Sequence, residues 1–302
     1  MGRIIKTFHW KDWVYLVLSV GFIVLQVWLD LLLPDYTKKI LEYAMTGMPM
    51  GEIWKQGGLM LACALGSAAS SVIVGYFAAR IASAVAFRLR SRVFDKVESF
   101  SMEEINKFST ASLITRTTND ITQVQMLIAM GLQMIVKAPI LAVWAIVKIS
   151  SRQWQWSVVV AAAVILLVLM FAFILLVVVP KFKKIQSMTD DMNSVTRENL
   201  TGVRVVRAYN AEAYQEEKFA GANERLTKTQ LFTSRAMAIM SPFLTVLISG
   251  ISLAIYWVGA YLIDALPTAA ERGDVYTQMI TFSSYAMQII MAFMMLAMIF
   301  VI

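Results

Sequence analysis

The stretch VVVAAAVILLVLMFAFILLVVV, from Val158 to Val179, decides the fold class because it contains no charged and no strongly hydrogen-bonding side chain. A helix of about 20 apolar residues crosses the roughly 30 Å hydrocarbon core of a bilayer. Inside lipid, backbone polar groups must find partners within the segment itself, and a helix meets that requirement. The stretch is therefore predicted to be a transmembrane helix.

Apolar stretches of similar length lie on both sides of it. The chain is 59% hydrophobic and 16% charged, whereas soluble domains average about 45–50% apolar and about 25% charged residues. These values exclude an ordinary soluble protein. We expect one all-α membrane domain over residues 1–302, with six transmembrane helices at about 13–33, 56–79, 121–147, 156–179, 236–263 and 275–302.

The composition also limits the chemistry of this chain. A single cysteine, Cys63, cannot form an intrachain disulfide. A single histidine, His9, supplies neither a His-ligated metal cluster nor a Ser-His-Asp centre. We therefore expect no catalytic residues, no metal and no cofactor in this chain.

The basic residues predict the orientation in the membrane. Most of the 27 Lys and Arg residues lie in the N-terminal segment and in the two long connections, residues 80–125 and 180–235. By the positive-inside rule, we expect these parts to be cytoplasmic and the short connections near Thr46, Ser151 and Ala269 to be external. The chain is thus expected to be a multi-pass cell-membrane protein with a cytoplasmic N-terminus. Its net charge of +7 then reflects loop orientation and not nucleic-acid binding.

The two long connections are expected to be helical hairpins that project from the membrane. Residues 181–235 contain only two glycines, Gly202 and Gly221, and neither connection has a Pro- or Gly-rich linker. Ser101 and Glu104 have the spacing of a capping box, which predicts a helix start near the tip of the first hairpin.

Two side-chain patterns lie within the spans. Small residues recur every four positions at Ser67, Ser71, Gly75, Ala79 and Ser83, and we interpret this stripe as a helix-packing seam. The last span carries a methionine stripe next to Gln288, which is typical of surfaces that accept differently shaped apolar ligands. The predicted substrate pathway consists of Lys137, Met287, Gln288, Met291, Met294 and Met298.

Ionisable side chains at membrane depth are the other candidates for function. Asp30 and Asp264 lie near the external ends of their spans, where we expect them to reach interfacial water. Lys137 lies nearer the middle of its span. Two roles stay open for it, namely lining a pathway and pairing with another side chain.

Two motifs resemble those of ABC exporter transmembrane domains. One is Thr115-Arg-Thr-Thr-Asn-Asp-Ile121, which follows the first hairpin tip. The other is Glu198-Asn-Leu-Thr-Gly-Val-Arg-Val-Val-Arg-Ala-Tyr-Asn-Ala-Glu212. With the six spans and the two long hairpins, the resemblance covers essentially the whole chain, and in detail it is closest to heterodimeric bacterial half-transporters.

The resemblance implies a type IV ABC transporter fold, in which two halves form a domain-swapped dimer by exchanging the fourth and fifth spans. It also implies that a short coupling helix at each hairpin tip contacts a nucleotide-binding domain. The residues that match these tips are Glu104, Ile105, Asn106, Lys107, Ala208, Tyr209, Asn210 and Glu212. This chain departs from many members at Thr110-Ala111-Ser112, where they carry a Thr-Gly-acidic sequence.

The sequence contains no G-x-x-x-x-G-K-(S/T) phosphate-binding loop. We therefore expect the chain to be the isolated, truncated transmembrane half of a transporter, with ATP and Mg²⁺ bound by an absent nucleotide-binding domain. The resemblance implies export of small amphipathic or apolar compounds, with nucleotide-binding domains, a second half-transporter and membrane lipid as partners. Two other hypotheses remain: a membrane scaffold or sensor with docking arms, and an ion-coupled secondary transporter.

Overall fold

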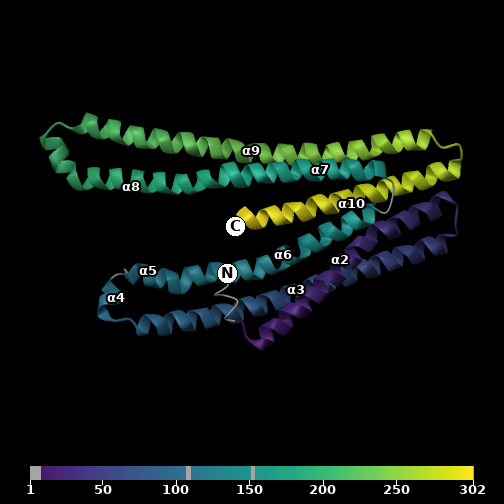
Figure 1. Cartoon of the computed structure of the whole chain (residues 1–302), viewed down its shortest axis with the longest axis horizontal. Helices are drawn as coiled ribbons and strands as arrows, with labels where there is room; N and C mark the ends of the chain where they lie inside the picture. The colour runs from purple at the N-terminus through teal and green to yellow at the C-terminus, as the bar shows by residue number, and fades with distance from the viewer. Residues whose placement is uncertain (1–7, 107–109, 151–153, 302) are drawn as a thin grey trace. The chain divides into compact units, whose positions relative to one another are not determined.

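The computed structural model describes residues 8–106, 110–150 and 154–301. Every regular element within these residues is a helix (Figure 1). The chain divides into two compact units. The first unit consists of Met1–Val160 and Ala254–Phe300, and the second consists of Ala161–Leu253.

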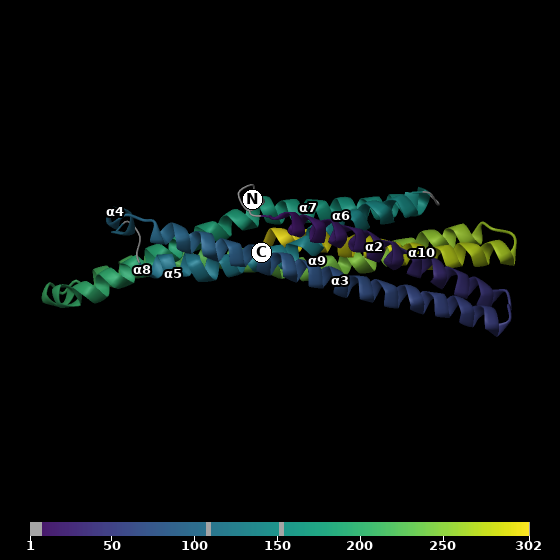
Figure 2. The same ribbon diagram turned by 90° about the horizontal axis from the view of Figure 1, so that it is seen from below.

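The first unit packs helices from both ends of the chain. Its main pair is α2 (Trp10–Met45) and α3 (Met50–Glu98), which run side by side (Figures 1 and 2). Both also contact α6 (Ile121–Ser150), and α10 (Ala269–Val301) adds the residues around Tyr285 to the core. Between α3 and α6 lie the short elements α4 (Met102–Asn106), α5 (Thr110–Thr115) and the π-helix η1 (Arg116–Asp120).

The second unit is built from one long antiparallel helix pair. One side consists of the later part of α7 (Trp154–Phe173), the π-helix η2 (Ile174–Val178) and α8 (Val179–Ala208). The other side is the greater part of α9 (Glu212–Asp264). The two sides lie next to each other along the hairpin, where Lys218 of α9 pairs with Glu198 of α8 at 2.8 Å (Figure 1).

The structure confirms the expected all-α fold with six spans. Six helices among the described residues are long and apolar enough to cross a membrane. They continue well beyond the apolar stretches, since α3 runs to Glu98 and α8 runs to Ala208. The long connections are thus helical arms, as their lack of helix breakers predicts.

The predicted capping box is present at the tip of the first hairpin. The Ser101 backbone N–H donates to Glu104 Oε2 at 3.0 Å, and the Glu104 backbone N–H donates to Ser101 Oγ at 3.3 Å. Each residue thus satisfies a backbone donor of the other and fixes the start of α4.

A π-helical turn occupies the first family-like motif. Residues Arg116–Asp120 form η1, which joins α5 to α6 without a break in the helical path. Thr117 Oγ1 donates to the carbonyl oxygen of Leu113 at 2.7 Å, and Thr118 Oγ1 donates to that of Ile114 at 2.8 Å. Single π-turns are rare and often occur at functional positions. The sequence pattern alone did not predict this one.

At the second tip, Asn210 ends α8. Its φ of 49° is left-handed, and the N–H of Ala211 donates to the carbonyl oxygen of Val206 at 2.9 Å. The N–H of Asn210 donates to Arg207 O at 3.3 Å, which completes a Schellman motif. Asparagine is also a common N-cap residue, but here it ends α8 and does not start α9. Asparagine tolerates the left-handed conformation, so it suits this helix end equally well.

Candidate functional site

A chain of charged contacts lies along α2. Four ionisable residues of this helix, Asp30, Asp35, Lys38 and Glu42, contact side chains of neighbouring helices. At 1.5 Å rise per residue, they extend over about 18 Å of the helix axis. All their partners described below belong to the first unit.

The first group surrounds Asp30. Lys137 Nζ of α6 lies 3.1 Å from Asp30 Oδ2, and the Ser67 hydroxyl of α3 donates to Asp30 Oδ1. The Asp30 and Lys137 side chains are 25% and 19% exposed. Gln288 Nε2 of α10 lies 3.4 Å from the Asp30 carbonyl oxygen. Two helices, α3 and α6, thus supply donors to the Asp30 carboxylate, which offsets the cost of burying it, and α10 supplies one to its backbone carbonyl.

The second group lies five residues further along α2. Lys148 Nζ of α6 is 2.8 Å from Asp35 Oδ2. The hydroxyl of Tyr285, on α10, donates to Asp35 Oδ1 at 2.8 Å and lies 3.2 Å from the carbonyl oxygen of Leu31. Because Tyr285 is fully buried, its hydroxyl needs such a partner.

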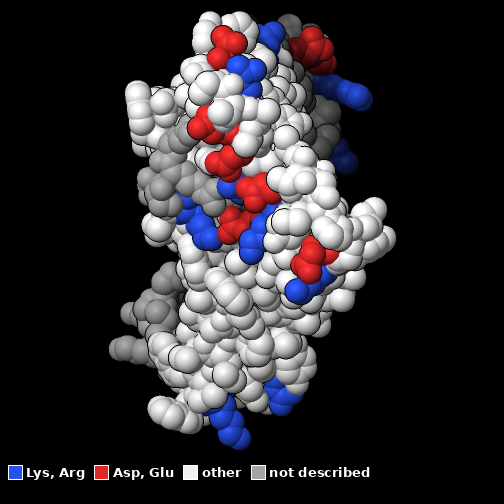
Figure 3. Space-filling view, turned by 90° about the vertical axis from the view of Figure 1, so that its right-hand side faces the viewer, with Lys and Arg blue, Asp and Glu red and all other residues white. Residues whose placement is uncertain are grey.

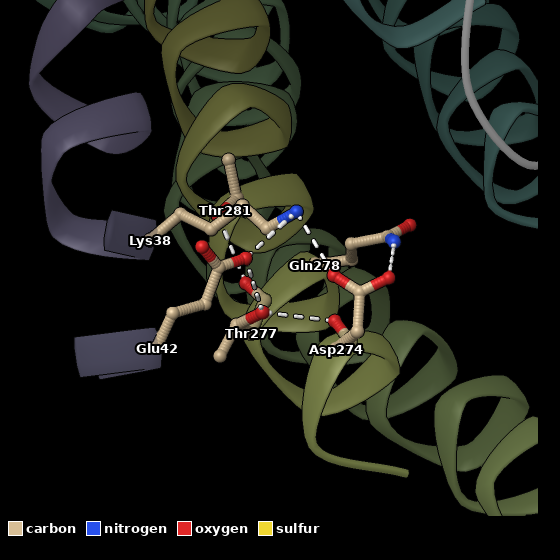
Figure 4. Close-up of polar contacts among 6 residues, drawn as sticks. All are labelled: Lys38, Glu42, Asp274, Thr277, Gln278 and Thr281. Atoms are coloured by element: carbon tan, nitrogen blue, oxygen red, sulfur yellow. Dashed lines mark hydrogen bonds and ion pairs between the residues drawn. The ribbon is translucent and has the colours of Figure 1, made fainter. Parts of the chain in front are cut away.

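The third group joins the end of α2 to the start of α10 (Figure 4). Lys38 Nζ lies 3.0 Å from both Glu42 Oε1 and Asp274 Oδ1. Thr277 Oγ1 donates to the Asp274 carbonyl oxygen at 2.9 Å, and Gln278 Nε2 donates to Asp274 Oδ2 at 2.7 Å. Figure 3 faces the side of the molecule where α2 ends and α10 begins, and acidic and basic side chains are interspersed there. Alternating charges of this kind lower the cost of placing each one near lipid.

A cavity of about 200 Å³ adjoins the first group. An apolar cavity of about 150 Å³ is known to hold benzene, so this volume suits a small ring or a group of waters. Its wall combines apolar and hydrogen-bonding side chains from four helices, namely Ile23, Gln26, Ser71, Val74, Gln133, Met134, Lys137 and Met295.

The structure shows pairing for Lys137, which is one of the two roles that the sequence left open. Lys137 both pairs with Asp30 and lines the cavity. Asp30, which is expected to reach interfacial water, also has partners on three neighbouring helices. Helix position alone did not reveal these partners, because they depend on how α3, α6 and α10 are aligned with α2.

The predicted methionine stripe lies on α10. Met287 and Met294 are half-buried, whereas Met291 is 53% exposed. The side chain of Met298 lies outside those described. The α10 methionine that lines the cavity is Met295, which the sequence prediction did not include. Its position, one turn after Met291, is the signal that was overlooked.

Part of the small-residue stripe of α3 contacts neighbouring helices, whereas Ala79 and Ser83 are exposed. Ser67 bonds Asp30 of α2, and Ser83 Oγ accepts a hydrogen bond from Gln125 Nε2 of α6 at 3.3 Å. A Cβ on Gly75 would lie 3.5 Å from Gln133 Nε2, which shows how closely α6 approaches. The seam therefore combines close packing with hydrogen bonds.

The predicted coupling residues are found at both hairpin tips. Glu104 is exposed in α4, which also contains Ile105 and Asn106, while Lys107 lies outside the described residues. In the second unit, Ala208, Asn210 and Glu212 are exposed, and Tyr209 is 80% exposed.

A groove of about 420 Å³ adjoins the second tip. It lies between α8 and α9 and includes Arg207, Glu212 and Glu216. The side-chain oxygen Oε1 of Gln215 is buried there without a hydrogen-bond partner among the described residues. Further along, the hydrogen bond that Lys218 donates to Glu198 raises the pKa of Lys218 above its usual value.

Six long apolar helices, an internal charged network and two long helical hairpins define a multi-pass helical membrane protein. The chain belongs to the ABC transporter transmembrane region family, whose family model matches residues 16–293. The match covers nearly the whole chain and is to the membrane region of these transporters.

Several relatives are similar over most of this chain. It is 32% identical over 241 residues to an uncharacterized ABC transporter ATP-binding protein of Mycobacterium tuberculosis, covering 80% of this chain and 39% of the relative. It is 27% identical over 250 residues to YfiB, an uncharacterized ABC transporter ATP-binding protein of Bacillus subtilis. This match covers 82% of this chain and 43% of YfiB. It is 25% identical over 191 residues to an ATP-dependent lipid A-core flippase of Syntrophus aciditrophicus. This match covers 62% of this chain and 32% of the flippase. The chain therefore spans less than half the length of these relatives.

Proposed function

We propose that this chain is the translocation domain of an ATP-driven exporter of small amphipathic or apolar compounds. In this proposal it lies in the cell membrane with its N-terminus and both hairpins in the cytoplasm. Its partners are nucleotide-binding domains, which bind ATP and Mg²⁺, and a second half-transporter. The similarity to a lipid A-core flippase supports an amphipathic cargo.

The observation that carries the proposal is the continuity of the helices between the spans and the second hairpin tip. Both α8 and α9 run from apolar segments to the tip, where only Tyr209, Asn210 and Ala211 separate them. A displacement of the tip is therefore transmitted along rigid helices to the membrane. Alternating access by shifts of packed helices needs such a connection.

Tyr209 is the proposed contact with the nucleotide-binding domain. It lies outside the predicted spans, so lipid does not cover its ring. An exposed aromatic side chain at an interface is a typical anchor, and its removal costs about 2 kcal/mol or more of binding free energy. The separation of α8 and most of α9 into their own unit also supports the exchange of these helices between two halves.

The test uses the full-length transporter in proteoliposomes. Tyr209→Ala is expected to reduce ATP-dependent uptake of a lipophilic fluorescent dye at least tenfold, and to abolish dye-stimulated ATP hydrolysis, with unchanged membrane insertion. Tyr261→Ala, at another well-exposed tyrosine near the end of α9 that is far from the tip, is the control. Unchanged coupled transport in Tyr209→Ala would refute the role of this tip.

The cargo part of the proposal has its own test. The substrate is proposed to contact the α10 face of Met287, Gln288, Met291, Met294 and Met298, together with Lys137. Replacing Met291 and Met298 with Ala is expected to change which of several apolar dyes are exported, while ATP hydrolysis without dye is retained. An unchanged dye preference would argue against this face.

A further inference from the structure

An apolar groove in the second unit is separate from all the sites described above. It has a volume of about 440 Å³ and lies between α7 with η2 on one side and α9 on the other. Ten of its eleven lining residues are apolar, and the eleventh is Arg235. The groove is partly open, so a flexible molecule has access to it.

The length of the groove matches one leaflet of a bilayer. On α9 its lining extends from Phe232 to Phe243, which corresponds to about 16 Å of helix axis. Half of a hydrocarbon core of about 30 Å is about 15 Å. The lining residues recur every three or four positions on both helices, so they form two facing apolar stripes.

Two cations lie at the same end of this groove. Arg235 is part of the lining, and it is one helical turn from Phe232 on α9. Lys181 Nζ, at the start of α8, lies 5.8 Å from the centre of the Phe232 ring. Arg235 and Lys181 are both exposed, and among the described residues no carboxylate pairs with either one.

We propose that this groove binds one anionic phospholipid, with an acyl chain along the apolar stripes and the phosphate between Arg235 and Lys181. Two unpaired cations at the end of a leaflet-long apolar groove complement the charge and the shape of such a lipid. The cation–π contact with Phe232 holds the Lys181 ammonium beside the groove. A zwitterionic lipid fits the apolar part equally well, but the two cations contribute less to its binding free energy because it has no net negative charge.

The test uses native mass spectrometry of the full-length transporter, exchanged into equal amounts of phosphatidylglycerol and phosphatidylcholine with identical acyl chains. The parent protein is expected to retain phosphatidylglycerol in preference to phosphatidylcholine. Arg235→Gln and Lys181→Gln are each expected to reduce that preference about fivefold, the factor that one basic residue contributes at an anionic surface. Arg225→Gln changes an exposed arginine of α9 outside the groove lining and is expected to have no effect.

The apolar half of the site has a separate test. Ala236→Trp fills the groove next to Arg235, so it is expected to reduce retention of both lipids.

Met240→Trp places a fluorescent side chain in the groove. Bromine atoms on the acyl chains of bound phosphatidylglycerol are expected to quench the fluorescence of this added tryptophan. Equal retention of the two lipids by the parent, or an equal effect of Arg225→Gln, overturns the proposal. Absence of quenching at Met240→Trp also overturns it, because a protein partner then covers the groove.

Discussion

Lys137 Nζ lies 3.1 Å from a carboxylate oxygen of Asp30, although 107 residues separate them in the sequence. The pair joins α2 to α6, and both side chains are largely buried. A single charge that is buried in this way is energetically costly, whereas a pair of opposite charges is tolerated. The stability of the first unit therefore depends on both residues being present.

The pair predicts a specific pattern of stabilities. Lys137→Met leaves the Asp30 carboxylate without its cation, and we expect a loss of about 3 kcal/mol of stability. Asp30→Asn combined with Lys137→Met is expected to recover most of it, because both charges are then absent. The measurement is thermal unfolding of the full-length transporter in detergent.

The matched control is Lys55→Met. Lys55 lies 3.7 Å from Glu52, and both side chains are well exposed, so its loss is expected to change stability by less than about 1 kcal/mol. A double variant no more stable than Lys137→Met would show that Lys137 acts by something other than its charge.

Tyr285→Phe tests the second charged group. The substitution removes only the hydroxyl that donates to Asp35, and we expect a loss of about 1–2 kcal/mol. Tyr276→Phe, at an exposed tyrosine on the same helix, serves as the control. Thermal unfolding measures both, and equal effects would contradict a specific role for the Asp35 contact.

Asn210 is expected to be sensitive to branched side chains. Its φ of 49° disfavours valine, so Asn210→Val is predicted to weaken the end of α8 by about 1–2 kcal/mol. Faster hydrogen exchange at the Ala211 amide, which bonds Val206, is the measurement. Asn210→Gly is expected to keep slow exchange, since glycine adopts positive φ freely.

A valine in a helix interior provides the comparison. Asn223→Val changes an exposed residue within α9, where asparagine and valine have similar helix propensities. It is expected to leave exchange at Ala211 unchanged. Protection of Ala211 in Asn210→Val equal to that in the parent would refute the proposed strain.

Cysteine labelling in intact cells tests the orientation. In a variant without Cys63, an impermeant maleimide is expected to label Thr46→Cys from outside, and Tyr209→Cys only after the cells are made permeable. The reason is the concentration of Lys and Arg around residues 80–125 and 180–235. The reverse pattern would show that the N-terminus is external.

The sequence predicted what depends on local rules. Charge-free stretches such as Val158–Val179 marked the spans, because lipid requires helices of a fixed length. The absence of helix breakers predicted the hairpin arms. The Ser101–Glu104 capping box was found from spacing alone, since the contacts that it needs lie three residues apart.

What the sequence missed depends on contacts between distant segments. The partners of Asp30 come from three other helices, and no local pattern fixes the alignment of these helices. Met295 was overlooked for the same reason, because the face of α10 that meets Lys137 depends on packing. The capping role of Asn210 could not be predicted, because asparagine suits both ends of a helix and only the backbone angle decides between them.

The charged contacts of α2 have a consequence for synthesis of the protein. Asp30 reaches the membrane 107 residues ahead of Lys137, and Asp35 is made 250 residues before Tyr285. At about 5–20 residues per second, α2 waits roughly 5–20 s for the Lys137 cation that pairs with Asp30. During that interval its carboxylates depend on water or on the insertion machinery. Premature release of the nascent helix into lipid is thus disfavoured until α6 arrives, and assembly of the bundle follows the order of translation.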